Sequence, residues 1–262
     1  MNWYIGTMGF SYIDWKGVFY PHEMPSRNYL AYYSRVFNCV EIDSTFYGTP
    51  RIETIKRWWA VTPEHFKFCV KVPRIISHEL GSGNKSGLME EFLDSVRLLK
   101  TKLGVILIQF PPSFKFNQLN VLDNFISGLP AGFHFSVEVR DRSWYTNWDE
   151  FSQLLSTYGV CWAATEYPRL PNEIHLTAPF AYVRWVGKHG SYSRHDHERV
   201  DRLDNLGYWS TQIDHLPVGV CDLYGFFNND YAGFAPGTAN RFKTLVGLSV
   251  ENYQPPEQGT LF

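Results

Sequence analysis

Short runs of β-branched and apolar residues recur along the chain and alternate with segments of helical periodicity. Apolar residues three or four positions apart mark the helical segments, for example in RNYLAYYSRVF and RIETIKRWWAV. The expected strands are residues 3–6, 39–47, 66–73, 103–111, 134–140, 160–166, 181–187 and 218–229. Alternation of strands and helices is typical of βα units that build a parallel sheet.

Eight such units in a chain of 262 residues predict an α/β protein, a single (β/α)8 TIM-type barrel. The segment YPRLPNEIHLTAP, between the sixth and seventh expected strands, is rich in proline and fits a helix poorly. We therefore expect a somewhat irregular barrel. The expected barrel domain covers residues 1–250, and the linker-like residues 251–262 are expected to form a short flexible tail.

Composition and charge narrow the classes of protein that fit. Hydrophobic residues make up 44% of the chain, which suits a large core, and the net charge of −2 gives no broad attraction to nucleic acid or lipid. We expect no membrane association, because no apolar stretch reaches the roughly 18 residues of a membrane span. The N-terminal MNWYIGTMGF does not have the pattern of a signal peptide.

The four cysteines lie singly in apolar runs, without a C-x-x-C pair. This pattern is typical of buried free thiols in a reducing compartment. The sequence therefore predicts a cytoplasmic protein.

Polar residues interrupt the expected strands near their C-terminal ends, as in CVEIDST, FCVKVP, LIQFPP, FSVEVR, YVRWVG and GFFNND. Parallel strands covered on both faces should instead be continuous apolar runs. Alternation along a strand turns Val40 and Ile42 toward the helices. The same alternation turns a set of polar side chains toward the barrel interior: Glu41, Asp43, Lys71, Gln109, Glu138, Arg140, Arg184 and Asn228.

These buried charges must pair with one another or face a wet pocket, and barrel enzymes build their sites at these strand ends. Glu41 and Glu138 are candidates for a general acid and base, with pKa values separated by the neighbouring Lys71 and arginines. Alternatively, Lys71, Arg140 and Arg184 bind a phosphate or carboxylate. The structural alternative is a buried layer of ion pairs that fixes the packing of the barrel.

His78 follows the third expected strand and completes the candidate catalytic set of Glu41, Lys71, Glu138 and Arg184. The alternative for His78 is a capping or surface role. A divalent metal stays open, with Glu41, Asp43, Glu138 and His78 as its ligands, although no H-E-x-x-H spacing supports it. No P-loop, nucleophile elbow or dinucleotide fingerprint occurs, so the sequence indicates no cofactor.

Aromatic residues make up 17% of the chain, and many lie outside the apolar runs. They predict an aromatic wall around a substrate cleft, with ordinary core packing as the alternative. The candidate substrate-binding residues are the strand-end groups Asp43, Gln109 and Arg140, the amides Asn228 and Asn229, and the aromatics Phe10, Trp15, Tyr20, Tyr47 and Trp144.

The chain resembles the YecE-like family (domain of unknown function 72) in six blocks that occur in order: YIGTMGFSYIDWKGVFYP, FNCVEIDSTFYGTP, FKFCVKVPRIISHE, KLGVILIQFPPSF, SVEVRDRSW and GFFNND. The blocks extend from residue 4 to about residue 240. The resemblance implies a TIM-barrel fold and supplies no activity. Val186 stands where the family tends to have a histidine in R-x-H-G, so this chain either lacks that histidine or uses His189 instead.

The last five residues, QGTLF, resemble the pentapeptide that binds the bacterial sliding clamp. The resemblance implies that Leu261 and Phe262 fill an apolar pocket of the clamp while Gln258 makes polar anchoring contacts. Gly259 departs from the motif, which usually has leucine there. The alternative is that Leu261 and Phe262 pack back onto the barrel.

Three hypotheses of function follow. The preferred one is an enzyme, a hydrolase or lyase with paired carboxylates, that acts on a nucleotide or DNA-derived substrate and is recruited by the clamp. The second is a glycosidase-like or other small-metabolite hydrolase. The third is a non-catalytic barrel that binds a ligand.

Overall fold

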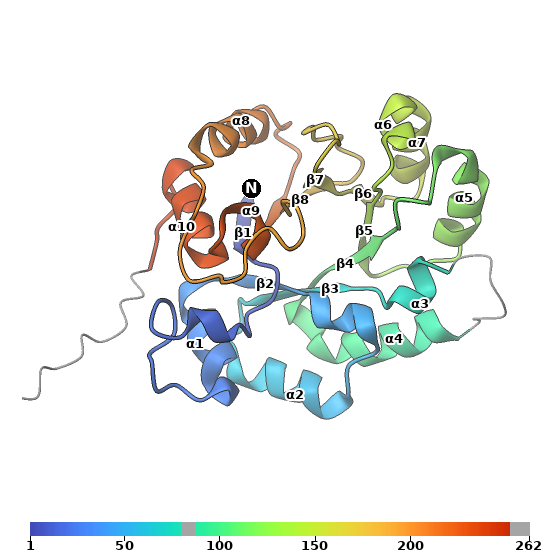
Figure 1. Cartoon of the computed structure of the whole chain (residues 1–262). Helices are drawn as coiled ribbons and strands as arrows, with labels where there is room; N and C mark the ends of the chain where they lie inside the picture. Colours follow the sequence, from blue (N-terminus) through green and yellow to red (C-terminus); the bar gives the residue numbers. More distant parts are fainter. Residues whose placement is uncertain (80–86, 252–262) are drawn as a thin grey trace, which may run out of the picture.

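The computed structural model describes residues 1–79 and 87–251 (Figure 1). The strands are β1 Asn2–Thr7, β2 Cys39–Ile42, β3 Lys67–Lys71, β4 Leu103–Gln109, β5 His134–Glu138, β6 Cys161–Trp162, β7 Ala164–Glu166, β8 Phe180–Trp185 and β9 Asp222–Phe227. The α-helices are α1 Tyr29–Val36, α2 Ile52–Val61, α3 Arg74–Ser77, α4 Leu88–Val96, α5 Leu119–Ser127, α6 Arg142–Thr146, α7 Trp148–Thr157, α8 Leu203–Asp214, α9 Asn229–Ala232 and α10 Ala235–Leu245. Short 3-10 segments are η1 Ile13–Trp15, η2 Ser26–Asn28, η3 Asp43–Tyr47, η4 Arg97–Lys102 and η5 Phe116–Gln118.

The strands form two parallel sheets, and the predicted single closed TIM-type barrel is wrong. One sheet has the order β1-β9-β8-β7 and the other has the order β2-β3-β4-β5-β6. Every strand pair in both sheets is parallel. Alternation of strands and helices is confirmed, but the hydrogen-bonded ladder does not continue around all the strands.

Side chains explain why β1 and β2 do not pair as a ladder. The Asn38 side chain accepts a hydrogen bond from the Ile5 amide and donates one to the Trp3 carbonyl. The Tyr33 hydroxyl accepts a hydrogen bond from the Thr7 amide at 2.9 Å. These side chains satisfy backbone groups of β1 that a neighbouring strand would otherwise satisfy. Between the described residues of β1 and β2, the backbone pairing is reduced to an isolated bridge between Met8 and Glu41.

A side chain also ends the second ladder at β6. The Trp162 amide donates a hydrogen bond to the Thr177 hydroxyl, which itself donates to the Val160 carbonyl. The extended segment 161–166 is consequently divided between the sheets, because β6 pairs with β5 whereas β7 pairs with β8. Residues 167–179 contain no helix, as the proline-rich sequence predicts.

Apolar side chains of the strands pack in two layers, which confirms the predicted alternation in β2. Val40 and Ile42 belong to the larger core cluster, which includes the helices. Cys39 and Tyr182 belong to a second cluster that joins residues of both sheets. Figure 1 shows the longer helices around the outside of the strands. The polar side chains that were predicted to point inward therefore lie between the two sheets.

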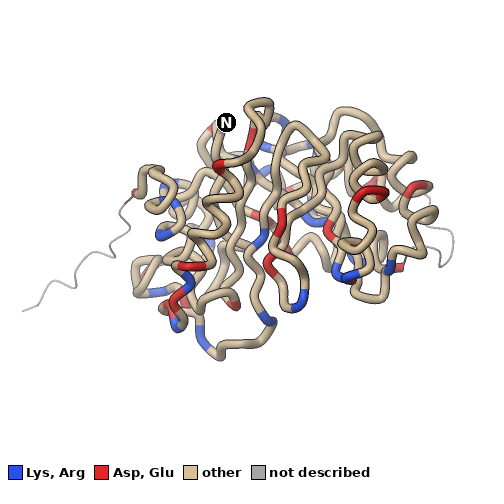
Figure 2. Tube along the Cα trace, turned by 90° about the horizontal axis from the view of Figure 1, so that it is seen from above, with Lys and Arg blue, Asp and Glu red and all other residues tan. Residues whose placement is uncertain are grey.

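The surface of the described chain has mixed charge. Figure 2 shows Lys and Arg positions interspersed with Asp and Glu positions around the molecule. Among residues 1–79 and 87–251, no helix has both the length and the apolar character needed to cross a membrane. Cys39, Cys69 and Cys161 are buried free thiols as predicted, whereas Cys221 is exposed because it lies just before β9.

Candidate functional site

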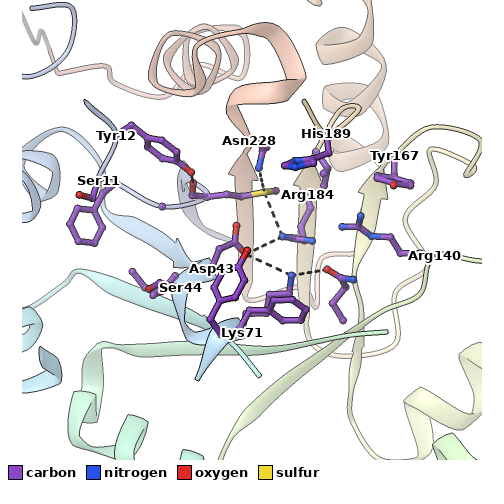
Figure 3. Close-up of a pocket in the computed structure, with 18 of the residues that line it drawn as sticks. Ser11, Tyr12, Asp43, Ser44, Lys71, Arg140, Tyr167, Arg184, His189 and Asn228 are labelled. Atoms are coloured by element: carbon purple, nitrogen blue, oxygen red, sulfur yellow. Dashed lines mark hydrogen bonds and ion pairs between the residues drawn. The ribbon is translucent and has the colours of Figure 1, made fainter. Parts of the chain in front are cut away.

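A cavity of about 570 Å³ lies at the C-terminal ends of the strands, where residues of both sheets meet (Figure 3). Parallel strands bring their C-terminal ends to the same edge, which explains why residues far apart in sequence converge there. The predicted site residues that line the cavity are Phe10, Asp43, Tyr47, Lys71, Gln109, Arg140, Arg184 and Asn228.

Arg184, at the end of β8, is the buried centre of the charged network. Its Nε and Nη2 atoms donate hydrogen bonds to the Glu41 carboxylate at 2.9 and 2.6 Å. Tyr182 donates to the same carboxylate at 2.6 Å. Nη2 also lies 3.6 Å from Oδ1 of Asp43, on the side of the cavity. Glu41 thus holds Arg184 in place from below.

Glu138, at the end of β5, completes the base of the network. Arg184 Nη1 donates to one of its oxygens, and Arg140 Nε donates to the other at 2.5 Å. Both Glu138 and Glu41 are fully buried and neither lines the cavity. The predicted acid–base pair is therefore engaged with arginines beneath the cavity floor.

Lys71, at the end of β3, forms a second part of the floor. Its Nζ atom donates to the Gln109 side-chain oxygen at 2.7 Å and lies 4.1 Å from the centroid of the Phe46 ring. Asp43 Oδ1 is 3.9 Å from this Nζ atom. This oxygen is buried and makes no hydrogen bond to the described residues, although it lies between two cations. Figure 3 shows Lys71 and Arg184 both directed at Asp43.

Burial and neighbouring charges change the titration of these groups. Burial opposes ionisation of Glu138, but Arg140, Arg184 and Lys71 together lower its pKa to about 2. Burial raises the pKa of Glu41, and Arg184 opposes that effect. Burial lowers the pKa of Lys71, with Asp43 acting in the opposite direction. Glu138 is thus held as a carboxylate, whereas Lys71 is shifted toward its neutral form.

Aromatic side chains form part of the cavity wall. Phe10, Tyr12, Phe46 and Tyr167 line it, and the Tyr167 ring lies 4.2 Å from the Arg140 guanidinium. Tyr47 is 89% exposed at the rim. Aromatic side chains therefore line this cavity, and Phe10 and Tyr47 are the two of the five predicted aromatics that are among them.

The other predicted aromatics and Asn229 lie in the core rather than at the cavity. Trp15 donates a hydrogen bond to Asn229, and Tyr20 stacks on Tyr29 with ring centroids 4.0 Å apart. Trp144 donates to the Phe114 carbonyl. Each indole or hydroxyl group has an internal partner, so these aromatic side chains can be fully buried. These side chains pack the core. The sequence alone did not distinguish aromatic residues of the core from those that line the cavity.

His78 lies behind the cavity wall. Its ring packs edge-to-face on Phe46 at 5.0 Å, and Nδ1 is 3.1 Å from the Ser77 hydroxyl. Burial, with Lys71 and Arg74 nearby, lowers its pKa to about 4. This geometry separates His78 from the cavity, so a catalytic role is not supported by its position.

The candidate metal ligands do not come together. Glu41 and Glu138 direct their oxygens at arginines, and His78 lies behind Phe46. In the described part of the chain, no three His, Cys, Asp or Glu side chains form a group that could hold a metal ion. The residues predicted for a metal site therefore do not fit one.

Two titratable residues, His189 and Asp230, were not in the predicted catalytic or binding sets, although the family resemblance had raised His189 as one alternative to the missing histidine. His189 lines the cavity, and its Nδ1 atom is 3.3 Å from Asp230. Both follow strands, His189 after β8 and Asp230 after β9, and the GFFNND block was the available signal for Asp230. The predicted clamp-binding residues Gln258, Leu261 and Phe262 lie outside the described residues.

The fold and the cavity define an α/β protein of two parallel sheets with a charged pocket at the strand ends. The chain belongs to the family described as "Protein of unknown function DUF72", whose model matches residues 4–260. The family predicted from the sequence blocks is thereby confirmed.

Two related proteins match this chain over different fractions of its length. The chain is 36% identical over 118 residues to UPF0759 protein YecE of Escherichia coli K12, covering 45% of this chain and 43% of YecE. The match thus spans less than half of that relative. The chain is 24% identical to UPF0759 protein YunF of Bacillus subtilis, over 96% of this chain and 97% of YunF.

Crystal structures of two DUF72 family proteins have a similar fold. The protein from Thermotoga maritima matches with a TM-score of 0.79 and 30% identity, over 94% of this chain and 99% of that chain. The protein from Enterococcus faecalis V583 matches with a TM-score of 0.77 and 20% identity, over 95% and 98%. The second similarity indicates the fold alone.

Proposed function

We propose that the cavity is the active site of an enzyme that acts on a small organic molecule bearing a phosphate or carboxylate group. One observation carries the proposal. Three cationic side chains and one carboxylate line the cavity, namely Lys71, Arg140, Arg184 and Asp43. The two other carboxylates of the network, Glu41 and Glu138, are fully buried beneath them.

Division of charge between the floor and the layer below favours an anionic ligand. Glu41 and Glu138 orient Arg184 and Arg140, which leaves the cationic side to the cavity. A phosphate or carboxylate is well matched to guanidinium and ammonium donors. Asp43, 3.9 Å from Lys71 Nζ, opposes the effect of burial on the pKa of Lys71 and favours its charged form.

Size and walls favour an organic ligand with a ring. The volume of about 570 Å³ lies in the range of small-molecule sites. Phe10, Phe46 and Tyr47 offer aromatic surface for a sugar or base above the cationic floor. We therefore place nucleoside monophosphates and sugar phosphates first among the candidates.

The geometry does not favour the glycosidase alternative. A glycosidase needs two carboxyl groups that flank the scissile bond. Glu41 and Glu138 are instead buried against Arg184, and among the described residues that line the cavity Asp43 is the one carboxylate.

The proposal is tested by calorimetric titration of the full chain with adenosine 5′-monophosphate (AMP), ribose 5-phosphate and inorganic phosphate. We expect saturable binding, weakened tenfold or more by Lys71→Met and by Arg140→Gln. Lys56→Met, an exposed position on α2, is the matched control. Phosphate esters that bind are then followed by ³¹P NMR for turnover. Absence of binding, or equal loss in the Lys56 control, would contradict the proposal.

Recruitment by a sliding clamp is supported by the QGTLF sequence alone. Fluorescence anisotropy of a labelled peptide of residues 251–262, titrated with a bacterial sliding clamp, tests it. We expect saturable binding that is lost in a peptide with Leu261→Ala and Phe262→Ala. Equal behaviour of the two peptides would refute clamp docking without affecting the proposal for the cavity.

A further inference from the structure

Two histidines of the segment between β8 and α8 contact opposite oxygens of one buried carboxylate. His189 Nδ1 is 3.3 Å from Oδ2 of Asp230, and His195 Nε2 is 3.6 Å from Oδ1. Asp230 lies in α9 and is 8% exposed. His195 Nδ1 is also 3.8 Å from Asp14. Two side chains of the sequence HGSYSRHDHER therefore pack against Asp230 of α9.

The backbone fixes the segment against Asp230. The Gly190 amide donates a hydrogen bond to Oδ2 of Asp230 at 3.0 Å. Gly187 has a φ of +72°, and a Cβ atom added there would lie 2.4 Å from the Asp230 carbonyl oxygen. Only glycine can accept both this conformation and this approach. The Asn228 side chain accepts from the Asp230 amide at 2.9 Å, which fixes the start of α9.

His189 is held where it can meet a ligand. It lines the cavity with Asn228, and Figure 3 shows it across the cavity from Lys71. Its side chain is 98% exposed, so the ring gains no stability from burial. A carboxylate that lies beside Nδ1, here at 3.3 Å, favours the tautomer with the proton on Nδ1, in which Nε2 carries the free lone pair. That nitrogen is then a proton acceptor.

We infer that Asp230 and His189 form a carboxylate–imidazole pair that supplies the cavity with a general base. His189 Nε2 accepts a proton from an O–H group of the bound molecule or from a water molecule: the O–H bond breaks, an N–H bond forms and the electron pair stays on the oxygen. The imidazolium then releases the proton to solvent, so the step needs no other reactant. Asp230 acts as a positioning residue. The inference rests on the function proposed for the cavity.

The charged groups around this pair come from several elements. Lys188 precedes His189 in its own segment, and Arg184 lies at the end of β8. Asp43, Lys71 and Arg140 line the remainder of the cavity. Proton transfer at His189 therefore occurs opposite a cationic floor, which suits a molecule with its anionic group on Lys71 and its hydroxyl at the rim.

The test is ¹⁵N NMR of histidine side chains in the full chain, at a pH where the rings are neutral. His189→Gln assigns the signal. We expect the Nδ1–H tautomer of His189 in the wild-type protein and its loss in Asp230→Asn. Asp14→Asn is the matched control, because Asp14 contacts His195 and not His189, and it should leave the His189 tautomer unchanged. The same samples are titrated with AMP, whose binding should shift the Nε2 resonance of His189.

The outcomes separate this inference from the function proposed above. An Nε2–H tautomer in the wild-type protein, or the same tautomer in Asp230→Asn, would overturn the pair, and the wild-type spectrum decides if Asp230→Asn does not fold. AMP that binds by calorimetry without moving the Nε2 resonance would overturn the role of His189 as a base. If AMP, ribose 5-phosphate and phosphate all fail to bind, the proposed function is refuted. The tautomer of His189 still shows in that case whether His189 and Asp230 form a pair.

Discussion

Arg184→Met tests whether the buried ion network stabilises the fold. Methionine replaces the guanidinium with an apolar group of similar length. Glu41 then retains the Tyr182 hydroxyl, and Glu138 retains Arg140. Removing one partner of a buried ion pair typically costs about 3–5 kcal/mol, because the remaining charge is left without compensation. For a chain of this size such a loss lowers Tm by roughly 10 °C.

The cost of Arg184→Met should depend on pH, with a sign that follows from Glu41. Without Arg184, burial raises the folded-state pKa of Glu41 further above its unfolded value. The folded state then binds more protons than the unfolded state, so stability falls as pH rises through the unfolded value near 4.5. The loss in free energy of unfolding relative to the wild-type protein should thus be larger at pH 8 than at pH 5. Adding Glu41→Gln to the variant should recover part of the loss at pH 8.

Urea-induced unfolding, followed by tryptophan fluorescence at pH 5 and pH 8, measures both effects. Arg241→Met is the matched control, because Arg241 also contacts two carboxylates, those of Glu198 and Asp201, but is 40% exposed. Its loss should stay below about 1 kcal/mol. A loss below about 1 kcal/mol for Arg184→Met, or one that does not change with pH, would refute the reasoning.

Three further predictions follow from the pKa shifts and the packing. The pKa of Glu138 is lowered to about 2, so Glu138 stabilises the fold above its unfolded-state pKa of 4.5, and this contribution is lost as pH falls toward 2. In Glu138→Gln, the free energy of unfolding measured by urea titration should therefore change less over this pH range. Asn38→Ala should cost about 1–3 kcal/mol per unpaired backbone group and speed hydrogen exchange in β1 rather than in β4. Gly187→Ala should lower stability by about 1–3 kcal/mol or more in thermal unfolding because it meets Asp230, and should exceed Gly159→Ala, where φ is also positive but the space is open.

Residue alternation predicted the convergence of charge, but not its arrangement. The inward-facing charged residues near the strand ends are those that alternation along each strand predicts: Glu41, Lys71, Glu138 and Arg184. Alternation depends only on local position, because successive side chains of a strand point to opposite faces. Which inward residue reaches the cavity depends on depth along the strand and on its partners. The glutamates were therefore predicted as catalytic groups, whereas the structure places both of them fully buried in contact with Arg184.

Closure of the strands could not be predicted from the strand count. Whether neighbouring strands pair depends on Asn38 and Thr177, which lie outside the strands and occupy the backbone groups of β1 and β6. The aromatic residues posed a similar problem. Tyr47 is 89% exposed and Trp144 is fully buried, and that difference arises from tertiary packing.

The sheet that contains β1 has a consequence for synthesis and folding. The strands β2 to β6 follow one another in the chain and pair with sequence neighbours, so every strand of this sheet is present once residue 162 has left the ribosome. β1 pairs with β9, where Asn2 is opposite Asp222, so its ladder partner is made only after all the strands of the other sheet. Contacts of such sequence separation slow folding. Until then, Asn38 and Tyr33 provide the first native hydrogen-bond partners for the β1 backbone, which makes this junction the place where the N-terminal strand is first retained.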